Sequence, residues 1–173
     1  MLSTGFHQSS SRVSPSARIL ALDVGKKRIG LAISDELGIT AQGLDTLQRT
    51  RIRDDLARLT SLIRARGVTK LLIGRPLHMS GSESRQSAYT EEFAERLQQT
   101  CDIPIVFWDE RLTTVEAERL LREGNATIDE RKRAVDRLSA VLLLESYLEH
   151  QDISRAADAS IHDDGADAED SAS

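Results

Sequence analysis

The stretch Arg18–Ser34, RILALDVGKKRIGLAIS, decides how the rest of the chain is arranged. Its apolar run predicts a buried strand over about 18–24 that carries a carboxylate, Asp23, and a second apolar strand follows over about 29–35. The short link between the two strands predicts an antiparallel hairpin, in which Gly25 is free to take a positive φ. A carboxylate in a buried strand is costly unless it is paired or binds a cation. Asp23 is therefore the first indication of function.

The segments after this hairpin alternate between strands and helices. The patterns predict a strand over about 40–48, a helix over 51–66, a strand over 70–74, a helix over 84–99, a strand over 103–108, and helices over 114–123 and 129–149. Helix boundaries are predicted from capping residues: Thr50 caps and Gly67 ends the helix over 51–66. The capping boxes Thr113–Glu116 and Thr127–Glu130 begin the helices over 114–123 and 129–149. Strand–helix–strand crossovers join parallel neighbours. The sequence thus predicts an α/β fold with a five-stranded mixed sheet, a three-strand antiparallel meander plus two parallel strands, and helices on both faces.

The charge is unevenly distributed along the chain. The net charge is -5, but residues 151–173 alone hold seven acids and one base. We therefore expect a flexible N-terminal arm over 1–16, one domain over 17–150, and a disordered acidic tail over 151–173. The central domain is close to neutral and can still carry a basic face. The absence of a long apolar run predicts no membrane span, and the single cysteine, Cys101, fits a reducing cytoplasm.

Three acids are placed so that the predicted fold would bring them together. Asp23 lies in the first strand, Glu110 follows the last strand, and Asp136 lies in the long helix with small residues beside it. Converging carboxylates repel each other unless a cation neutralises them, and oxygen ligands suit Mg²⁺ or Mn²⁺. Two such ions about 4 Å apart are a known arrangement for phosphoryl displacement. Alternatives remain open for each: Asp23 could cap the Gly25 turn, Asp109 competes with Glu110, and Asp136 could favour its helix N-terminus.

Basic residues surround the predicted site. The candidates for phosphate contact are Lys26, Lys27 and Arg28 at the hairpin tip, together with Arg75, Arg85 and Arg111. The hairpin triplet could equally be a solvated turn, and Arg111 could pair with a neighbouring acid. We interpret Asp35 as a turn residue and His78 as an ordinary loop residue.

The order of four motifs, DVGKKRIGLAIS, LLIGRPLHMSGS, WDERLTTVEAE and RAVDRLSAVLLLESYL, resembles the YqgF/RuvX family, whose members are small RNase H-fold proteins related to the Holliday-junction resolvase RuvC. The resemblance covers about residues 18–149. It implies an RNase H-like fold, metal dependence, and Asp23, Glu110 and Asp136 as catalytic acids and metal ligands. Ser139 stands where Ala is common in the family, and its small size should be tolerated.

The resemblance favours a divalent-metal-dependent nuclease acting on structured nucleic acid, with maturation of the 5′ end of pre-16S rRNA as the expected role. The alternative is a Holliday-junction resolvase, which needs two active sites and hence a homodimer. A second alternative is a nucleic-acid-binding module that cleaves nothing. A third takes the DVGKKRIG hairpin as the phosphate loop of an actin-like ATPase, which would need two domains of this fold where this chain holds one.

Overall fold

The fold is described from a computed structural model that covers residues 18–75, 85–109 and 127–163. The elements are β1 (Ile19–Val24), β2 (Arg28–Ser34), β3 (Ala41–Gly43), β4 (Leu47–Gln48), α1 (Ile52–Arg66), β5 (Lys70–Arg75), α2 (Arg85–Thr100), β6 (Ile105–Asp109) and α4 (Ile128–Asp163). The predicted helix over 114–123 and the predicted arm over 1–16 lie outside the described residues, as does the last part of the predicted tail. No helix of the described part is both long and apolar enough to span a membrane.

The strands form one mixed sheet in the order β3-β2-β1-β5-β6, and β4 also pairs with β2. β2 is antiparallel to β1, β3 and β4, whereas β1, β5 and β6 run parallel. This arrangement confirms the predicted RNase H-like α/β fold, with one correction. The strand predicted over 40–48 is two short strands, which makes the sheet six-stranded.

A bulge separates β3 from β4. Ala32 lies opposite Gly43 and Ile29 lies opposite Leu47, so two residues of β2 face the three residues 44–46. One extra residue in one strand is the definition of a β-bulge. The Leu44 amide still donates to Leu31 O at 2.8 Å, which keeps the chain attached to β2 through the bulge. The alternating pattern of the sequence does not reveal this extra residue.

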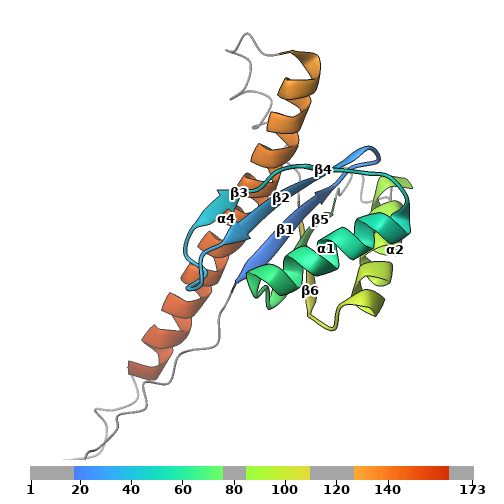
Figure 1. The fold of residues 1–173 in the computed structure, drawn as a ribbon. Coiled ribbons are helices and arrows are strands. Elements are labelled where there is room, and N and C mark those ends of the chain that lie inside the picture. Colours follow the sequence, from blue (N-terminus) through green and yellow to red (C-terminus); the bar gives the residue numbers. More distant parts are fainter. Residues whose placement is uncertain (1–17, 76–84, 110–126, 164–173) are drawn as a thin grey trace, which may run out of the picture.

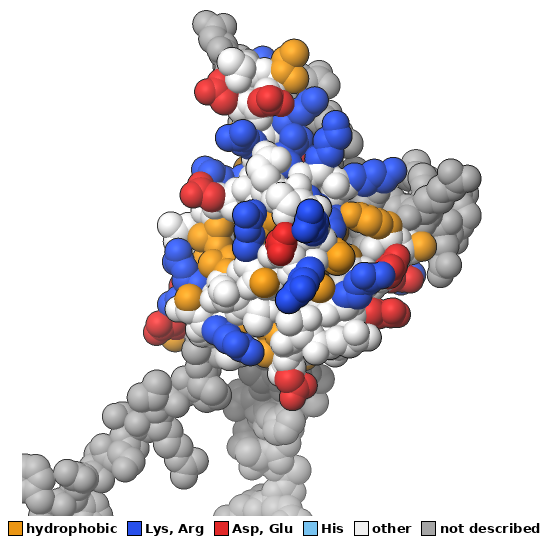
Figure 2. Space-filling model, turned by 45° about the vertical axis from the view of Figure 1, so that its right-hand side comes forward, with side chains coloured by type: hydrophobic (Ala, Val, Ile, Leu, Met, Phe, Trp, Pro, Cys, Tyr) orange, Lys and Arg blue, Asp and Glu red, His pale blue; other side chains and the backbone are white. Residues whose placement is uncertain are grey.

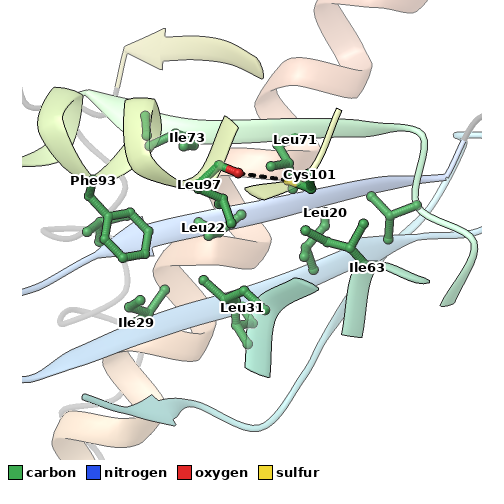
Figure 3. Packing of buried hydrophobic residues seen from close by; sticks show 14 of the residues in the cluster. Leu20, Leu22, Ile29, Leu31, Ile63, Leu71, Ile73, Phe93, Leu97 and Cys101 are labelled. Atoms are coloured by element: carbon green, nitrogen blue, oxygen red, sulfur yellow. Dashed lines mark hydrogen bonds between the residues drawn. The ribbon is translucent and has the colours of Figure 1, made fainter. Parts of the chain in front are cut away.

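Helices cover both faces of the sheet, as predicted (Figure 1). One cluster packs one face of the β1–β2 hairpin against α1 and α2, and Figure 3 shows Leu20, Leu22, Ile29 and Leu31 directed toward Ile63, Phe93 and Leu97. The second cluster packs the opposite face against α4; its members include Ile19, Ala21, Ala32, Leu72, Ala140, Leu143 and Leu144. Because side chains alternate along a strand, β1, β2, β5 and β6 each contribute to both clusters.

The boundaries of the helices differ from the predictions in two places and agree with them in two others. Thr50 does not cap α1: the N-cap is Arg51, which makes no side-chain cap bond, and Thr50 N donates instead to Asp55 Oδ1 at 3.0 Å. Gly67 ends α1 as predicted, with φ 62° in the left-handed region. The Thr127–Glu130 capping box is confirmed, with Thr127 N donating to Glu130 Oε2 at 3.0 Å. The helix that it opens runs to Asp163, so the first part of the segment predicted as a disordered tail is helical.

The hairpin tip also differs from the prediction. The positive-φ glycines of the described chain are Gly38 and Gly67, so Gly25 does not use a left-handed conformation. Gly25 is needed for a different reason: its amide donates to Arg28 O at 2.9 Å, and a Cβ at Gly25 would lie 2.7 Å from that oxygen. The tight turn therefore excludes a side chain by close approach.

Candidate active site

Asp23 lies on the α4 side of the sheet, near the carboxyl end of β1. Within β1, Ile19 and Ala21 pack into the α4 cluster, and the two-residue alternation places Asp23 on the same face. Asp23 is half-buried, at the border of the apolar core, and pairs in register with Gly30 of β2. The prediction that β1 carries this carboxylate at the end of its apolar run is confirmed.

Gly30 brings α4 onto the strand pair that carries Asp23. A Cβ built on Gly30 would lie 2.0 Å from Asp136 O and 2.6 Å from Asp136 C. The backbone of α4 at Asp136 therefore rests directly on β2, beside the position that pairs with Asp23. Because a glycine at this point has no side chain, the helix can approach the sheet this closely. The structure thus brings Asp23 and Asp136, which are far apart in sequence, to one place on one face of the sheet.

The side chain of Asp136 faces the sheet and is held by an arginine. Ser139, Ala140 and Leu143, which follow at helical spacing on the same side of α4, are fully buried. Arg28 Nε donates to Asp136 Oδ2 at 2.5 Å, and the two side chains are 18% and 25% exposed. Arg28 is thus an ion-pair partner of a predicted catalytic acid, a role that the sequence did not indicate. Within the part of the chain that the structure describes, the buried hydroxyl Oγ of Ser139 has no hydrogen-bond partner.

The third predicted acid, Glu110, lies outside the described residues. Its competitor Asp109 is the last residue of β6. Val106 and Trp108 pack on the α4 face, whereas Ile105 packs against the α1–α2 cluster, so alternation places Asp109 on the face opposite Asp23. This observation favours Glu110 over Asp109, and the assignment of Glu110 stays a prediction. Among residues 18–75, 85–109 and 127–163, no group of three or more His, Cys, Asp or Glu side chains is close enough to hold a metal ion.

The donor atoms of the two described acids fit a hard divalent cation. Asp23 and Asp136 offer carboxylate oxygens, which are the ligands that Mg²⁺ and Mn²⁺ prefer. The guanidinium of Arg28 at Asp136 shows that this carboxylate accommodates a positive charge. Asp35 stabilises a turn: its Oδ1 accepts from the amides of Ile39 at 2.6 Å and Thr40 at 3.1 Å, and these bonds lower its pKa. The prediction of Asp35 as a turn residue is confirmed.

The predicted phosphate contacts have different surroundings. Lys26 and Lys27 are exposed at the hairpin tip, whereas Arg75 pairs with Glu91 at 2.6 Å at the end of β5. Arg85 begins α2, and Arg111 lies outside the described residues. Figure 2 shows many Lys and Arg side chains and fewer acidic ones on the face toward α1 and α2. On α1 and its cap the exposed arginines outnumber the one exposed acid, Asp54; they are Arg51, Arg53, Arg58, Arg64 and Arg66.

A buried ion pair supports the hairpin tip from the other face. Arg49 Nε donates to Asp55 Oδ2 at 3.1 Å, with side chains only 9% and 0% exposed. Arg49 Nη1 also donates to Gly25 O at 3.1 Å and to the Tyr89 hydroxyl, and the guanidinium lies 4.9 Å from the centre of the Phe93 ring. Arg49 thus ties the turn after Asp23 to both α1 and α2. The sequence did not lead us to this pair, although a carboxylate between Ile52 and Leu59 on an apolar helical stripe was a usable signal.

Comparison with known proteins gives matches over most of the chain. Residues 17–150 match the family described as "RuvX: Holliday junction resolvase". A Koribacter versatilis protein named "Putative pre-16S rRNA nuclease" is 51% identical over 138 residues, which cover 80% of this chain and 90% of that protein. A protein of the same name from Carboxydothermus hydrogenoformans is 44% identical over 134 residues, covering 78% of this chain and 97% of that protein. Among solved structures, Thermus thermophilus RuvC aligns with a TM-score of 0.48 at 12% identity, over 78% of this chain and 95% of that chain.

Proposed function

The chain belongs to the RuvX family, and on this premise we propose that it is a cytoplasmic, divalent-metal-dependent nuclease that hydrolyses phosphodiester bonds in structured nucleic acid. The observation that carries the proposal is the contact between Gly30 and Asp136, which seats Asp136 beside Asp23 on one face of the sheet. Two acids from opposite ends of the domain's sequence are thus both adjacent to Gly30, and the catalytic unit we propose is residues 17–150.

The two acids would act as ligands of Mg²⁺ or Mn²⁺, with Glu110 as the proposed third. When bound, two such cations would lower the pKa of the attacking water and neutralise charge on the phosphate. Asp23 is positioned by the β1–β2 ladder and Asp136 by the close seating of α4, so neither carboxylate depends on a loop for its position. Rigid elements hold catalytic groups more accurately than loops do.

Basic side chains would position the nucleic acid without reading its sequence. Lys26 and Lys27 are exposed at the tip that directly follows β1, and the arginines of α1 continue the positive charge on the neighbouring side. Contacts to phosphates fix register and orientation and carry no base information. Arg75, Arg85 and Arg111 remain further candidates for such contacts.

Precursor 16S rRNA is the substrate we propose, because relatives that share 51% and 44% of their aligned residues with this chain carry a pre-16S rRNA nuclease name. The second candidate is a four-way DNA junction, which the family description favours. Junction cleavage requires two symmetric cuts and therefore a homodimer. A precursor-rRNA nuclease can act as a monomer.

The test compares the two substrates directly. Wild type and Asp23→Asn are each incubated with a 5′-extended 16S precursor RNA and with a four-way DNA junction, with and without Mn²⁺. We expect Mn²⁺-dependent cleavage of the RNA by wild type and a loss of at least about 10²-fold in Asp23→Asn, because even outer partners of metal ligands contribute 10- to 100-fold. Asp54→Asn, an exposed carboxylate on α1, is the matched control and should cleave normally.

Three results would contradict parts of this proposal. Equal cleavage by Asp23→Asn and wild type would refute the site. Tight binding of nucleic acid without cleavage by wild type would favour a binding module. Symmetric cleavage of the junction by a dimer, measured by solution mass with bound junction, would favour the resolvase.

A further inference from the structure

The ion pair between Arg28 and Asp136 joins the hairpin tip to the long helix. Arg28 Nε lies 2.5 Å from Asp136 Oδ2, and the two residues are 108 positions apart in the sequence. Both side chains are largely buried, at 18% and 25% exposed. A guanidinium offers five N–H donors in a fixed planar arrangement, which suits pairing with a carboxylate. In this structure Asp136 therefore has a positively charged partner at one of its oxygens.

The backbones on both sides of this pair are fixed. Arg28 is the first residue of β2 and pairs in register with Gln48, while the next residue, Ile29, pairs with both Val24 and Leu47. On the other side, the carbonyl of Asp136 rests on Gly30. The contact can therefore be broken by rotation of the Arg28 side chain while both backbones stay in place. Such a rotation leaves Asp136 in position and exposes its oxygen.

We propose that Arg28 is a resident counter-ion that competes with the divalent cation for Asp136. The inference rests on the proposed metal role of Asp136 and concerns how that site is controlled. In the absence of metal, the guanidinium neutralises a half-buried carboxylate that would otherwise be costly to keep charged. Binding of metal must displace it, so the affinity for the cation is lower than the acids alone would give. The displaced guanidinium has the planar donor geometry that suits a phosphate.

The test measures Mn²⁺ binding without nucleic acid, from the electron paramagnetic resonance signal of free Mn²⁺. Arg28→Gln removes the competing charge, and we expect it to bind Mn²⁺ roughly 3- to 10-fold more tightly than wild type, the effect of losing about one partly buried ion pair. Arg28→Lys keeps the charge but not the planar donor fork, so any tightening should be much smaller than in Arg28→Gln. The matched control is Arg137→Gln, the next residue of α4 after Asp136, whose guanidinium pairs with exposed Asp45 at 2.7 Å. It should leave the affinity unchanged.

Unchanged or weaker Mn²⁺ binding by folded Arg28→Gln would overturn the inference, as would equal tightening in Arg137→Gln. Circular dichroism melting of each variant establishes that it is folded. If Arg28→Gln does not fold, Arg28→Lys takes its place: the lysine side chain is shorter and lacks the planar donor fork, so it should pair less well with Asp136 and tighten Mn²⁺ binding by less than about twofold. Weaker Mn²⁺ binding by folded Arg28→Lys would then overturn the inference.

Asp136→Asn separates this inference from the proposed function. If Asp136→Asn binds Mn²⁺ as wild type does, Asp136 is not a ligand and the proposed site fails. If Asp136→Asn no longer binds Mn²⁺ and Arg28→Gln binds it no more tightly than wild type, the proposed site stands and only the counter-ion role of Arg28 fails. Loss of Mn²⁺ binding in Asp136→Asn together with tighter Mn²⁺ binding in Arg28→Gln supports both the proposed site and the counter-ion role.

Discussion

Gly30→Ala tests the contact on which the proposed site depends. A Cβ at residue 30 would lie 2.0 Å from Asp136 O, and a comfortable carbon–oxygen contact is about 3.3 Å. The helix and strand would have to separate by about 1.3 Å, since the difference between these two distances must be made up by backbone on both sides. Neither β2 nor α4 can supply this by rotating a side chain.

The expected cost is at the upper end of overpacking effects, about 3 kcal/mol of unfolding free energy. For a domain of this size each kcal/mol lowers the melting temperature by about 2–4 °C, so Gly30→Ala should melt about 6–12 °C below wild type. The same movement displaces Asp136 from Asp23. A misplacement of about 1 Å in a catalytic group can cost about 10²-fold in rate, so cleavage should fall more than stability alone explains.

Gly43→Ala is the matched control, because it adds the same methyl group on β3 against the same helix. Its Cβ would meet Arg137 Cγ at 2.7 Å and Cδ at 2.9 Å, which are atoms of a flexible side chain. Arg137 can move to another rotamer, so the expected cost is about 1 kcal/mol. The gain from a stiffer unfolded chain is common to both variants and cancels in the comparison. Denaturant unfolding of the two proteins measures the difference.

The reasoning fails if Gly30→Ala is as stable as Gly43→Ala. It also fails in part if Gly30→Ala is destabilised as expected but keeps full Mn²⁺-dependent cleavage, because the position of Asp136 would then not matter to the chemistry.

Three further predictions concern other parts of the fold. Asp55→Asn should lower the free energy of unfolding, measured with denaturant, by about 3 kcal/mol, because it leaves the buried Arg49 guanidinium without its carboxylate partner. The control is Glu36→Gln, which breaks the ion pair between Arg18 and Glu36. Because the Glu36 side chain is 73% exposed, the same measurement should change by less than about 1 kcal/mol. Gly67→Ala should cost about 1 kcal/mol although nothing lies within 4 Å of its Cβ, because φ is 62°, and a cost near zero in the same measurement would contradict the strain argument. Burial raises the pKa of the Cys101 thiol above its ordinary value of 9.0, so the folded state favours the protonated thiol. The contribution of this thiol to the free energy of unfolding is therefore fully present below pH 9 and is lost as the pH rises through the raised pKa. Melting curves recorded over a pH series should show this loss in wild type and not in Cys101→Ala.

The mixed sheet and the two helical layers could be predicted from the sequence because apolar patterns at periods of 2 and 3.6 record which side of each element is buried. Asp23 stood out for the same reason, as a charge at the end of an apolar run. The strand over 40–48 was predicted as continuous because a bulge changes the register by one residue without breaking the apolar pattern.

The ion pairs could not be predicted in this way. Arg28 was interpreted as one of three basic residues at a hairpin tip. Only the fold shows that it pairs with Asp136, which lies 108 positions away in the sequence. Arg49 lies in the link between β4 and α1, where local patterns do not record which side chains turn inward, and its partner Asp55 lies six residues on in the first turn of α1. Pairing between side chains depends on tertiary placement, and periodicity does not contain that information.

The bulge at residues 44–46 also has a consequence for self-association. The edge strand of a sheet has unpaired amides and carbonyls, to which a strand of another molecule can add. Proteins resist this addition with short or interrupted edge strands. Here β3 has three residues and β4 has two, and the carbonyl of Leu44 between them accepts from Arg137 Nε at 3.0 Å. Thr46 Oγ1 donates to Arg133 O at 3.2 Å, which holds the same segment on α4. This edge of the sheet is a poor template for intermolecular β-pairing, so it protects the protein from aggregation through β3 and β4. A dimer that cuts two nucleic-acid strands would therefore have to form through a different surface.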